Sequence, residues 1–267
     1  MSFSLVQAAR TVRHATVLAR ADMATFYTWK TWLFGWMVRL LCQVTFFSLI
    51  GVLVSDPEFT VYITLGACVM ICVTETMMAT ASTSWDKPMG TLPLLGASPV
   101  VPGFFFFGRS LQWPASATVT TTVALLALPP FFGVTWPLWQ IPVLVVTVAL
   151  IAFSSYCMTL ALAVVALAFP EARNVLSSVT TLYITAFCGA LVPLSYWPEP
   201  IRAVAQALPA THGLESVRLL ESGAVFNQFA ASLGTMVLSG VVWLVFSFLG
   251  FHYLFARARA GSRVLDF

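Results

Sequence analysis

Long apolar windows separated by short polar breaks run along the chain from residue 33 to residue 255. A helix that crosses the hydrocarbon core of a bilayer needs about 20 mostly apolar residues. Counted against that length, the windows predict six transmembrane helices, at about 33–54, 60–82, 108–128, 142–168, 174–194 and 232–255. The pattern therefore predicts an all-α polytopic membrane protein, with a single six-helix transmembrane domain over residues 31–267.

Residues 1–30 predict a different kind of helix. Arg10, Arg13 and Arg20 share one face of a helical projection, and the other face is apolar, with Leu5, Ala8, Val12, Ala15 and Ala19. This pattern is typical of an amphipathic helix that lies in the membrane plane. A simple positively charged anchor on the cytoplasmic side is the alternative.

The distribution of lysine and arginine predicts the orientation, because short cytoplasmic loops hold the excess of positive charge. With the N-terminus inside, ten of the 13 basic residues are cytoplasmic: Arg10, Arg13, Arg20, Lys30, Lys87, Arg109, Arg173, Arg257, Arg259 and Arg263. We therefore expect both termini in the cytoplasm. Trp136, Trp139 and Trp197 then lie at the external interface as aromatic anchors.

Composition excludes several classes of protein. The chain is 59% apolar and 9% charged, against roughly 45–50% and about 25% in soluble domains. The net charge of +3 comes from scattered arginines, which do not form the basic patch that nucleic-acid binding requires. All five cysteines fall in apolar segments without metal-ligand spacing. We expect no catalytic residue and no metal site.

Two charges interrupt the first two predicted spans. Arg39 and Glu75 each lie about 10 Å from the cytoplasmic end of their span at 1.5 Å per residue, so they can meet. Because an isolated charge in a bilayer is costly, we predict an intramembrane ion pair. It either pins two helices together or belongs to a substrate path or coupling relay; alternatively, Arg39 extends to lipid phosphate.

The predicted fifth span is rich in hydroxyl groups, among them Ser177, Ser178, Thr181 and Thr185. Small polar residues permit close helix packing, which favours a place at a subunit interface or beside a transport path. Hydroxyls that bond only to carbonyls of their own helix are the alternative.

Two stretches are more specific than hydropathy. Residues 85–99 read Trp-Asp-Lys-Pro-Met-Gly-Thr-Leu-Pro-Leu-Leu-Gly-Ala-Ser-Pro, and residues 189–198 read Gly-Ala-Leu-Val-Pro-Leu-Ser-Tyr-Trp-Pro. A third piece, Ala-Leu-Pro-Ala-Thr-His-Gly-Leu-Glu-Ser-Val-Arg, follows at 207–218. In this order the chain resembles the membrane permease of type-2 ATP-binding-cassette exporters, which carry drugs, polysaccharides and lipo-oligosaccharides. Pro93 stands where the family commonly has glutamate.

The resemblance implies a half-transporter. Two permease subunits, identical or paired with a relative, enclose the path, and two separate ATPase subunits hold ATP and Mg. In agreement, the sequence contains no GxxxxGK[ST] phosphate loop. The resemblance makes residues 86–99 an ATPase-coupling loop with the candidate residues Asp86, Lys87, Gly90, Thr91, Leu92, Leu94, Leu95, Ser98 and Pro99. We expect a short helix here with Leu92, Leu94 and Leu95 on its apolar side, which docks in a groove on the ATPase. An ordinary loop whose leucines rest on the bilayer is the alternative.

Prolines around residues 198–209 predict two short helices, at Ile201–Leu208 and Leu214–Leu220, before the last span. In the family such pieces are re-entrant and help to close the exit. We expect an external lid that contains Pro193, Trp197, Pro209, Glu215 and Arg218.

Together with these patterns, the resemblance implies a non-enzymatic export permease in the plasma (inner) membrane of a bacterium. Its partners are lipids, two ATPases and a second permease, and its cargo is an amphipathic drug, lipid or glycolipid. A transporter or channel driven by an ion gradient is the alternative, for which Glu75 is the one candidate carboxylate within a span. A membrane enzyme is a third class, although no paired acids or His/Glu cluster supports it.

Overall fold

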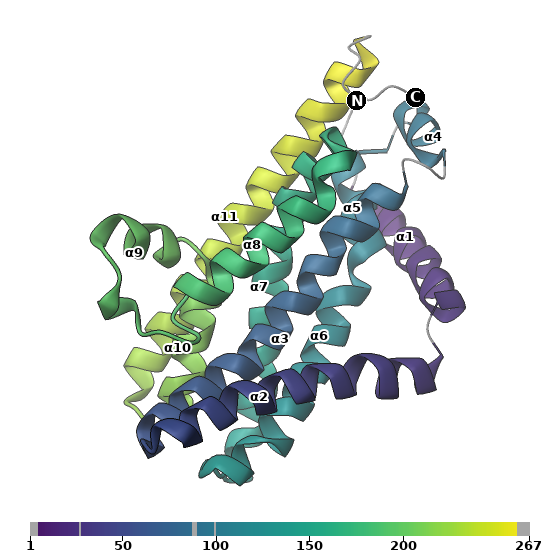
Figure 1. Cartoon of the computed structure of the whole chain (residues 1–267). Coiled ribbons are helices and arrows are strands. Elements are labelled where there is room, and N and C mark those ends of the chain that lie inside the picture. The colour runs from purple at the N-terminus through teal and green to yellow at the C-terminus, as the bar shows by residue number, and fades with distance from the viewer. Residues whose placement is uncertain (1–4, 27, 87–89, 99, 261–267) are drawn as a thin grey trace.

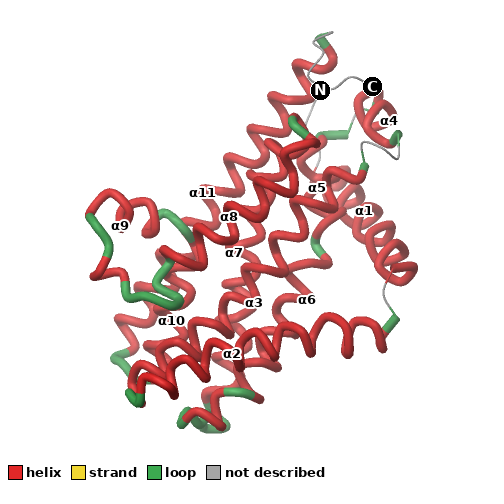
Figure 2. The backbone as a smooth tube through the Cα atoms, viewed as in Figure 1, coloured by secondary structure: helices red, strands yellow, loops and turns green. Residues whose placement is uncertain are grey.

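The computed structural model describes residues 5–26, 28–86, 90–98 and 100–260, and every regular element in these ranges is a helix (Figures 1 and 2). The first half contains α1 (Leu5–Phe26), a π-helical segment (Thr31–Met37), α2 (Val38–Val54), α3 (Pro57–Trp85), α4 (Thr91–Ala97), α5 (Pro102–Ser110) and α6 (Gln112–Ala127). The second half contains α7 (Gln140–Ala168), α8 (Arg173–Phe187), α9 (Glu199–Gln206), α10 (Pro209–Glu221) and α11 (Phe226–Arg259). Short 3₁₀ turns occupy Pro129–Phe132, Pro170–Ala172 and Leu194–Tyr196.

Five helical stretches in the described ranges are long and apolar enough to cross a membrane. They are Thr31–Val54, Pro57–Thr83, Pro102–Phe132, Gln140–Ala168 and Phe226–Arg259. The fold class is therefore confirmed as an all-α polytopic membrane protein. The predicted span 174–194 is the exception, since α8 has 15 residues and ends at Phe187. Such a helix is about 22 Å long, less than the hydrocarbon thickness of about 30 Å.

The third span is two helices in series. Pro114 lies in the first turn of α6, four residues after Ser110, the last residue of α5. A proline donates no backbone N–H and its ring clashes with the carbonyl four residues earlier, which breaks the helix there. The break sets α5 apart as a separate unit that contacts α1 and α11.

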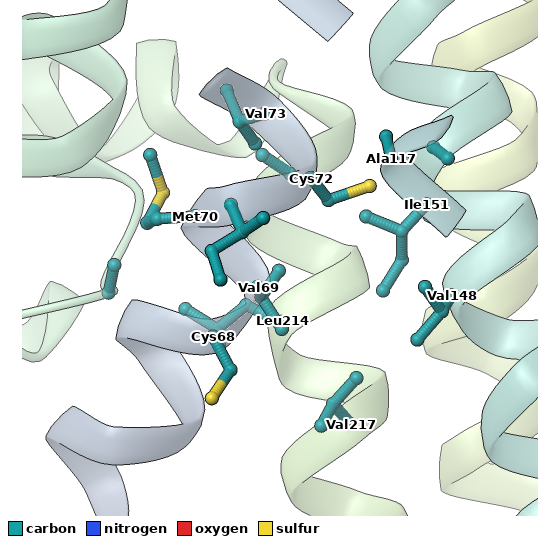
Figure 3. Packing of buried hydrophobic residues seen from close by; sticks show 14 of the residues in the cluster. Cys68, Val69, Met70, Cys72, Val73, Ala117, Val148, Ile151, Leu214 and Val217 are labelled. Atoms are coloured by element: carbon teal, nitrogen blue, oxygen red, sulfur yellow. The ribbon is translucent and has the colours of Figure 1, made fainter. Parts of the chain in front are cut away.

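Helix α3 is the centre of the bundle. It packs against α2, α6, α7, α8 and α10, and 78% of an 18-residue apolar window within it is buried. Figure 3 shows its side chains Cys68 and Cys72 among residues of the neighbouring helices, including Ala117, Ile151 and Leu214. Small and branched side chains fill this core, so the described cysteines there pack as apolar groups.

Helix α1 lies against α5, with its small apolar face inward. Ala15 and Ala19 are buried, and the approach is so close that a Cβ at Gly108 would lie 2.6 Å from the Val12 carbonyl oxygen. Thr16 also donates a hydrogen bond to the Gly108 carbonyl, at 3.1 Å. The amphipathic N-terminal helix is thus attached to the third span through a glycine.

Candidate functional site

The predicted coupling loop contains a short helix, α4, at the end of the bundle near α1 and α5 (Figure 1). Gly90 precedes it with a φ of 70°, a left-handed conformation that glycine adopts without a steric penalty. Thr91 begins the helix and donates its hydroxyl to the Asp86 carbonyl, at 2.8 Å. Two predicted loop residues, Lys87 and Pro99, lie outside the described residues.

The three leucines of α4 face in different directions, which corrects the prediction that all three lie on one docking face. Leu92 and Leu95 are 2% and 8% exposed and pack in a cluster with Phe106, Leu254 and Phe255. Leu94 points away from this cluster and is 74% exposed. Leu92 and Leu95 therefore fix α4 to α5 and α11, whereas Leu94 lies on the surface of the protein.

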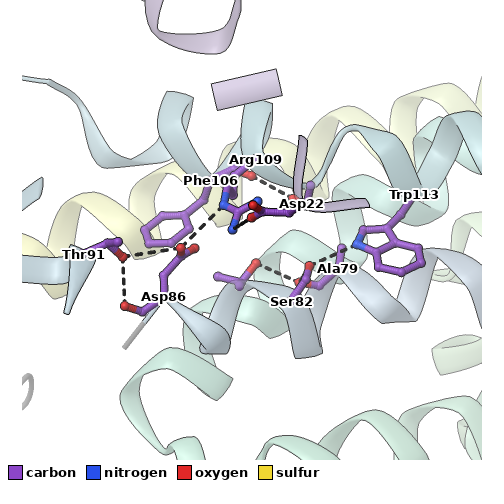
Figure 4. Close-up of polar contacts among 10 residues, drawn as sticks. Asp22, Ala79, Ser82, Asp86, Thr91, Phe106, Arg109 and Trp113 are labelled. Carbon is purple, nitrogen blue, oxygen red and sulfur yellow. Dashed lines mark hydrogen bonds and ion pairs between the residues drawn. The ribbon is translucent and has the colours of Figure 1, made fainter. Parts of the chain in front are cut away.

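A buried arginine, Arg109, is at the centre of a group of polar contacts beside α4 (Figure 4). The Arg109 guanidinium, on α5, lies 2.5 Å from Asp22 Oδ2 on α1 and 3.5 Å from Asp86 Oδ1 at the end of α3. The Asp86 side chain is 1% exposed and that of Arg109 is 8% exposed. We call Asp22, Asp86, Thr91 and Arg109 the arginine cluster. It joins α1, α3, α4 and α5 at one point.

Burial raises the pKa of Asp86 above the ordinary value for aspartate, and this effect outweighs the lowering by Arg109. Its second carboxylate oxygen, Oδ2, has no hydrogen-bond partner among the described residues. Two groups favour the ionised form of Asp86 over the neutral form: the Arg109 guanidinium and the Thr91 hydroxyl. Of these, only Arg109 carries a positive charge, so the cluster depends on it.

Asp22 and Arg109 were not predicted as site residues. The sequence could have indicated them because charged residues are rare in these segments. Asp22 is the one acidic residue in residues 1–30, and Arg109 is the one charged residue in residues 108–128. Two solitary opposite charges in neighbouring apolar segments are candidates for a pair, because each is costly to bury alone.

The far end of α4 is held by the last helix. Arg259, near the end of α11, donates from Nε to the Gly96 carbonyl at 3.1 Å and from Nη2 to the Ser98 carbonyl at 3.3 Å. A cation at a helix C-terminus satisfies carbonyls that have no partner within the helix and complements the helix dipole. Helix α4 is thus attached to the bundle at both ends.

The predicted ion pair between Arg39 and Glu75 is wrong in its geometry, because Trp36 lies between them. The Trp36 indole Nε1 donates to Glu75 Oε1 at 2.6 Å, and the Arg39 guanidinium stacks over the Trp36 ring at 4.7 Å. Glu75 is fully buried on α3. The indole satisfies one carboxylate oxygen, Oε1, whereas Oε2 has no hydrogen-bond partner among the described residues. The arginine interacts with the ring face as a cation–π contact.

Two hydroxyls of α8 donate to carbonyls of their own helix. Thr181 donates to the Ser177 carbonyl and Thr185 to the Thr181 carbonyl, both at 2.8 Å. Ser178 is exposed beside the apolar residues Val175, Val179 and Leu182. These bonds follow the alternative interpretation, and a role of Ser177, Ser178, Thr181 and Thr185 at a path or dimer interface stays a prediction.

At the opposite end of the bundle, the segment after α8 folds back onto α3. Tyr62 Oη donates to the Gly189 carbonyl at 2.6 Å, and Arg218 Nη2 donates to the Tyr62 and Ala190 carbonyls at 3.1 and 3.4 Å. The Arg218 guanidinium also lies 3.4 Å from the centre of the Tyr62 ring. These donors satisfy non-helical backbone that is buried in the protein.

Both short helices predicted before the last span are present, but the second begins earlier and lies deeper. Helix α10 begins at Pro209, its first residue, and buries Pro209, Leu214 and Val217 against α3, α7 and α11. It is a core element rather than a surface cover. Glu215 accepts a hydrogen bond from Ser232 on α11 at 3.2 Å.

Of the other predicted lid residues, Trp197 packs edge-to-face on Phe187 with ring centres 4.6 Å apart. Pro193 is half-buried before the turn at Leu194–Tyr196. The segment from 188 to 198 is thus fixed at α8 and at α3, and whether it acts as a lid stays a prediction.

Comparison with known families agrees with this arrangement. A search of curated proteins gives no match. The profile of the ABC-2 type transporter family matches residues 15–222, from within α1 to the end of α10, which is more than three quarters of the chain. The chain is therefore a multi-pass membrane protein that belongs to the ABC-2 type transporter family, as the permease subunit of an ATP-binding-cassette transporter.

Proposed function

We propose that this permease exports an amphipathic drug, lipid or glycolipid across the plasma membrane of a bacterium, using ATP that separate subunits hydrolyse. Two ATPase subunits, which bind Mg and ATP, and a second permease chain complete the transporter. The permease itself binds no nucleotide. This proposal extends the family assignment to the direction, energy source and assembly of the transporter.

The observation that carries the proposal is the division of α4 into an anchored face and a free face. Leu92 and Leu95 fix the helix to α5 and α11, while Leu94 is 74% exposed. An exposed leucine on a short anchored helix suits a hydrophobic groove of a partner. Pro93 in place of the family's glutamate makes this contact apolar rather than ionic.

The arginine cluster supplies a route for movement from α4 into the membrane domain. Arg109 joins α1 and α5 to Asp86, the residue that follows α3, and Asp86 is hydrogen-bonded to the first residue of α4. Since helices move as rigid elements, displacement of α4 by closing ATPase subunits carries α3 and α5 with it.

Purification from native membranes tests the proposal. We expect a subunit with a phosphate-loop motif to co-purify in stoichiometric amount, and Leu94→Asp to lose it without loss of membrane insertion. The matched control is Leu138→Asp, because Leu138 is 85% exposed and lies before α7, at the end away from α4. Solute transport by the chain alone, driven by an ion gradient, would contradict the proposal and favour the alternative centred on Glu75.

A further inference from the structure

A cavity of about 870 Å³ opens at the end of the bundle away from α4, within this single chain. Its walls come from the start of α3, the segment after α8, and α10, which lie together in Figure 1. The volume is within the range of about 300–1,000 Å³ found for small-molecule sites.

Part of the wall is apolar. Its apolar lining residues are Val61 and Leu65 of α3, together with Leu194 and Leu219. Such a surface favours the apolar body of a ligand, because burying it removes hydrocarbon from water.

The charged part of the wall is mainly acidic. Glu58 on α3 and Glu215 and Glu221 on α10 line the cavity. Among the described residues, Glu58 and Glu221 form no ion pair, and Glu215 lies 3.7 Å from His212 Nδ1. Burial raises the pKa of Glu221, which reflects the cost of its negative charge without a nearby cation.

The one arginine in the wall does not neutralise these carboxylates by direct contact. Arg218 stacks on the Tyr62 ring and donates to two backbone carbonyls instead. With three carboxylates and one engaged guanidinium, the lining keeps an excess of negative charge. An anionic ligand therefore meets repulsion, and a cation is attracted to these carboxylates, of which Glu221 is half-buried and Glu58 and Glu215 are exposed.

We infer that this cavity binds an amphipathic organic cation, with the positive group at Glu58 and Glu221 and the apolar body against α3 and Leu219. An inorganic metal ion is not the ligand, since no three acidic, histidine or cysteine side chains in the described residues converge on a metal position. The inference goes beyond the proposed function, because the site needs neither the ATPase nor a second permease.

Fluorescence anisotropy tests the site directly. The purified permease is placed in phosphatidylcholine nanodiscs and titrated with rhodamine 6G, a cationic dye, and with carboxyfluorescein, an anionic dye built on the same xanthene ring system. Empty nanodiscs give the background. We expect saturable binding of rhodamine 6G, at least tenfold tighter than that of carboxyfluorescein.

Charge-removing variants locate the binding. Glu58→Gln and Glu221→Gln should each weaken rhodamine 6G binding about fivefold, which corresponds to about 1 kcal/mol. The matched control is Glu199→Gln, because Glu199 is an exposed glutamate of α9 outside the cavity wall and pairs with Arg202. It should leave the affinity unchanged, and thermal melting confirms that each variant is folded.

Three results would overturn the inference: no saturable rhodamine 6G binding, equal binding of the two dyes, or unchanged affinity in the folded Glu58→Gln/Glu221→Gln double variant. None of these measurements involves ATP or a partner subunit. A negative result therefore leaves the proposed function standing, and a failure to recover an ATPase leaves the cavity site standing.

Discussion

Arg109 is buried at the α4 end of the bundle and Arg218 is half-buried at the other end, and the two arginines have different partners. At the α4 end, Arg109 lies between the carboxylates of Asp22 and Asp86. At the other end, Arg218 contacts the Tyr62 ring and the backbone carbonyls of Tyr62 and Ala190, while three glutamates line the cavity beside it.

The difference indicates what each end is built to do. Charges that pair within the chain hold four elements at one point, which suits the transmission of movement through α4. Glu58 and Glu221, which form no ion pair among the described residues, are available to a ligand. The predictions that follow test this contrast by removing one group at a time from each end.

The largest effect is expected from Arg109→Leu. It leaves the buried Asp86 without its cation, and breaking a buried ion pair from one side costs about 3–5 kcal/mol. Unfolding by SDS titration in mixed micelles measures the loss. Arg202→Met, at an exposed pair with Glu199, is the control and should cost less than about 1 kcal/mol.

Asp86→Asn should be much milder than Arg109→Leu. Because burial raises the pKa of Asp86, a neutral amide suits the site better than an unpaired carboxylate does. A loss for Asp86→Asn as large as that for Arg109→Leu would show that the ionised pair is required.

Within α4, Leu95→Ala should destabilise the protein and Leu94→Ala should not. Truncating a buried leucine costs about 2–5 kcal/mol, while an exposed change stays within about 0.5 kcal/mol. The same SDS titration measures both. Equal losses would contradict the division of α4 into an anchored and a free face.

Arg218→Met should lower stability by about 2 kcal/mol, since it removes charged hydrogen bonds to buried carbonyls. It should also tighten rhodamine 6G binding, because the cavity then loses its one guanidinium. Weaker binding in the folded variant would argue that Arg218 itself contacts the ligand.

The smallest effect is expected at Trp36. Trp36→Phe removes the hydrogen bond to Glu75 and should cost about 1 kcal/mol. A double-mutant cycle should show coupling between Trp36→Phe and Glu75→Gln, and near additivity between Arg39→Gln and Glu75→Gln. Strong coupling of Arg39 to Glu75 would restore the direct ion pair that the sequence predicts.

Hydropathy alone predicts most of the fold, because a membrane helix is defined by its apolar length. It fails after Phe187, where residues 188–194 remain apolar although the helix has ended. Gly189 has a φ of 86° there, and Tyr62 and Arg218 satisfy the buried carbonyls of Gly189 and Ala190, which lie outside any helix. Those donors are distant in sequence, so no local pattern reveals the end of α8.

The sequence predicts where the candidate site lies in the chain, but not the directions and contacts of its side chains. The resemblance locates residues 86–99, yet the direction of each leucine depends on Phe106 and Phe255, which belong to other helices. Likewise, the depths of Arg39 and Glu75 match, but an indole that lies between them is visible only in three dimensions.

The most direct test of the coupling role of α4 is photo-crosslinking in native membranes. A benzophenone amino acid is placed at position 94 and, as a control, at position 138. The account predicts that position 94 gives a product with a phosphate-loop ATPase, identified by mass spectrometry, and that position 138 does not. Products with lipid alone from position 94, or the same ATPase from both positions, would contradict it.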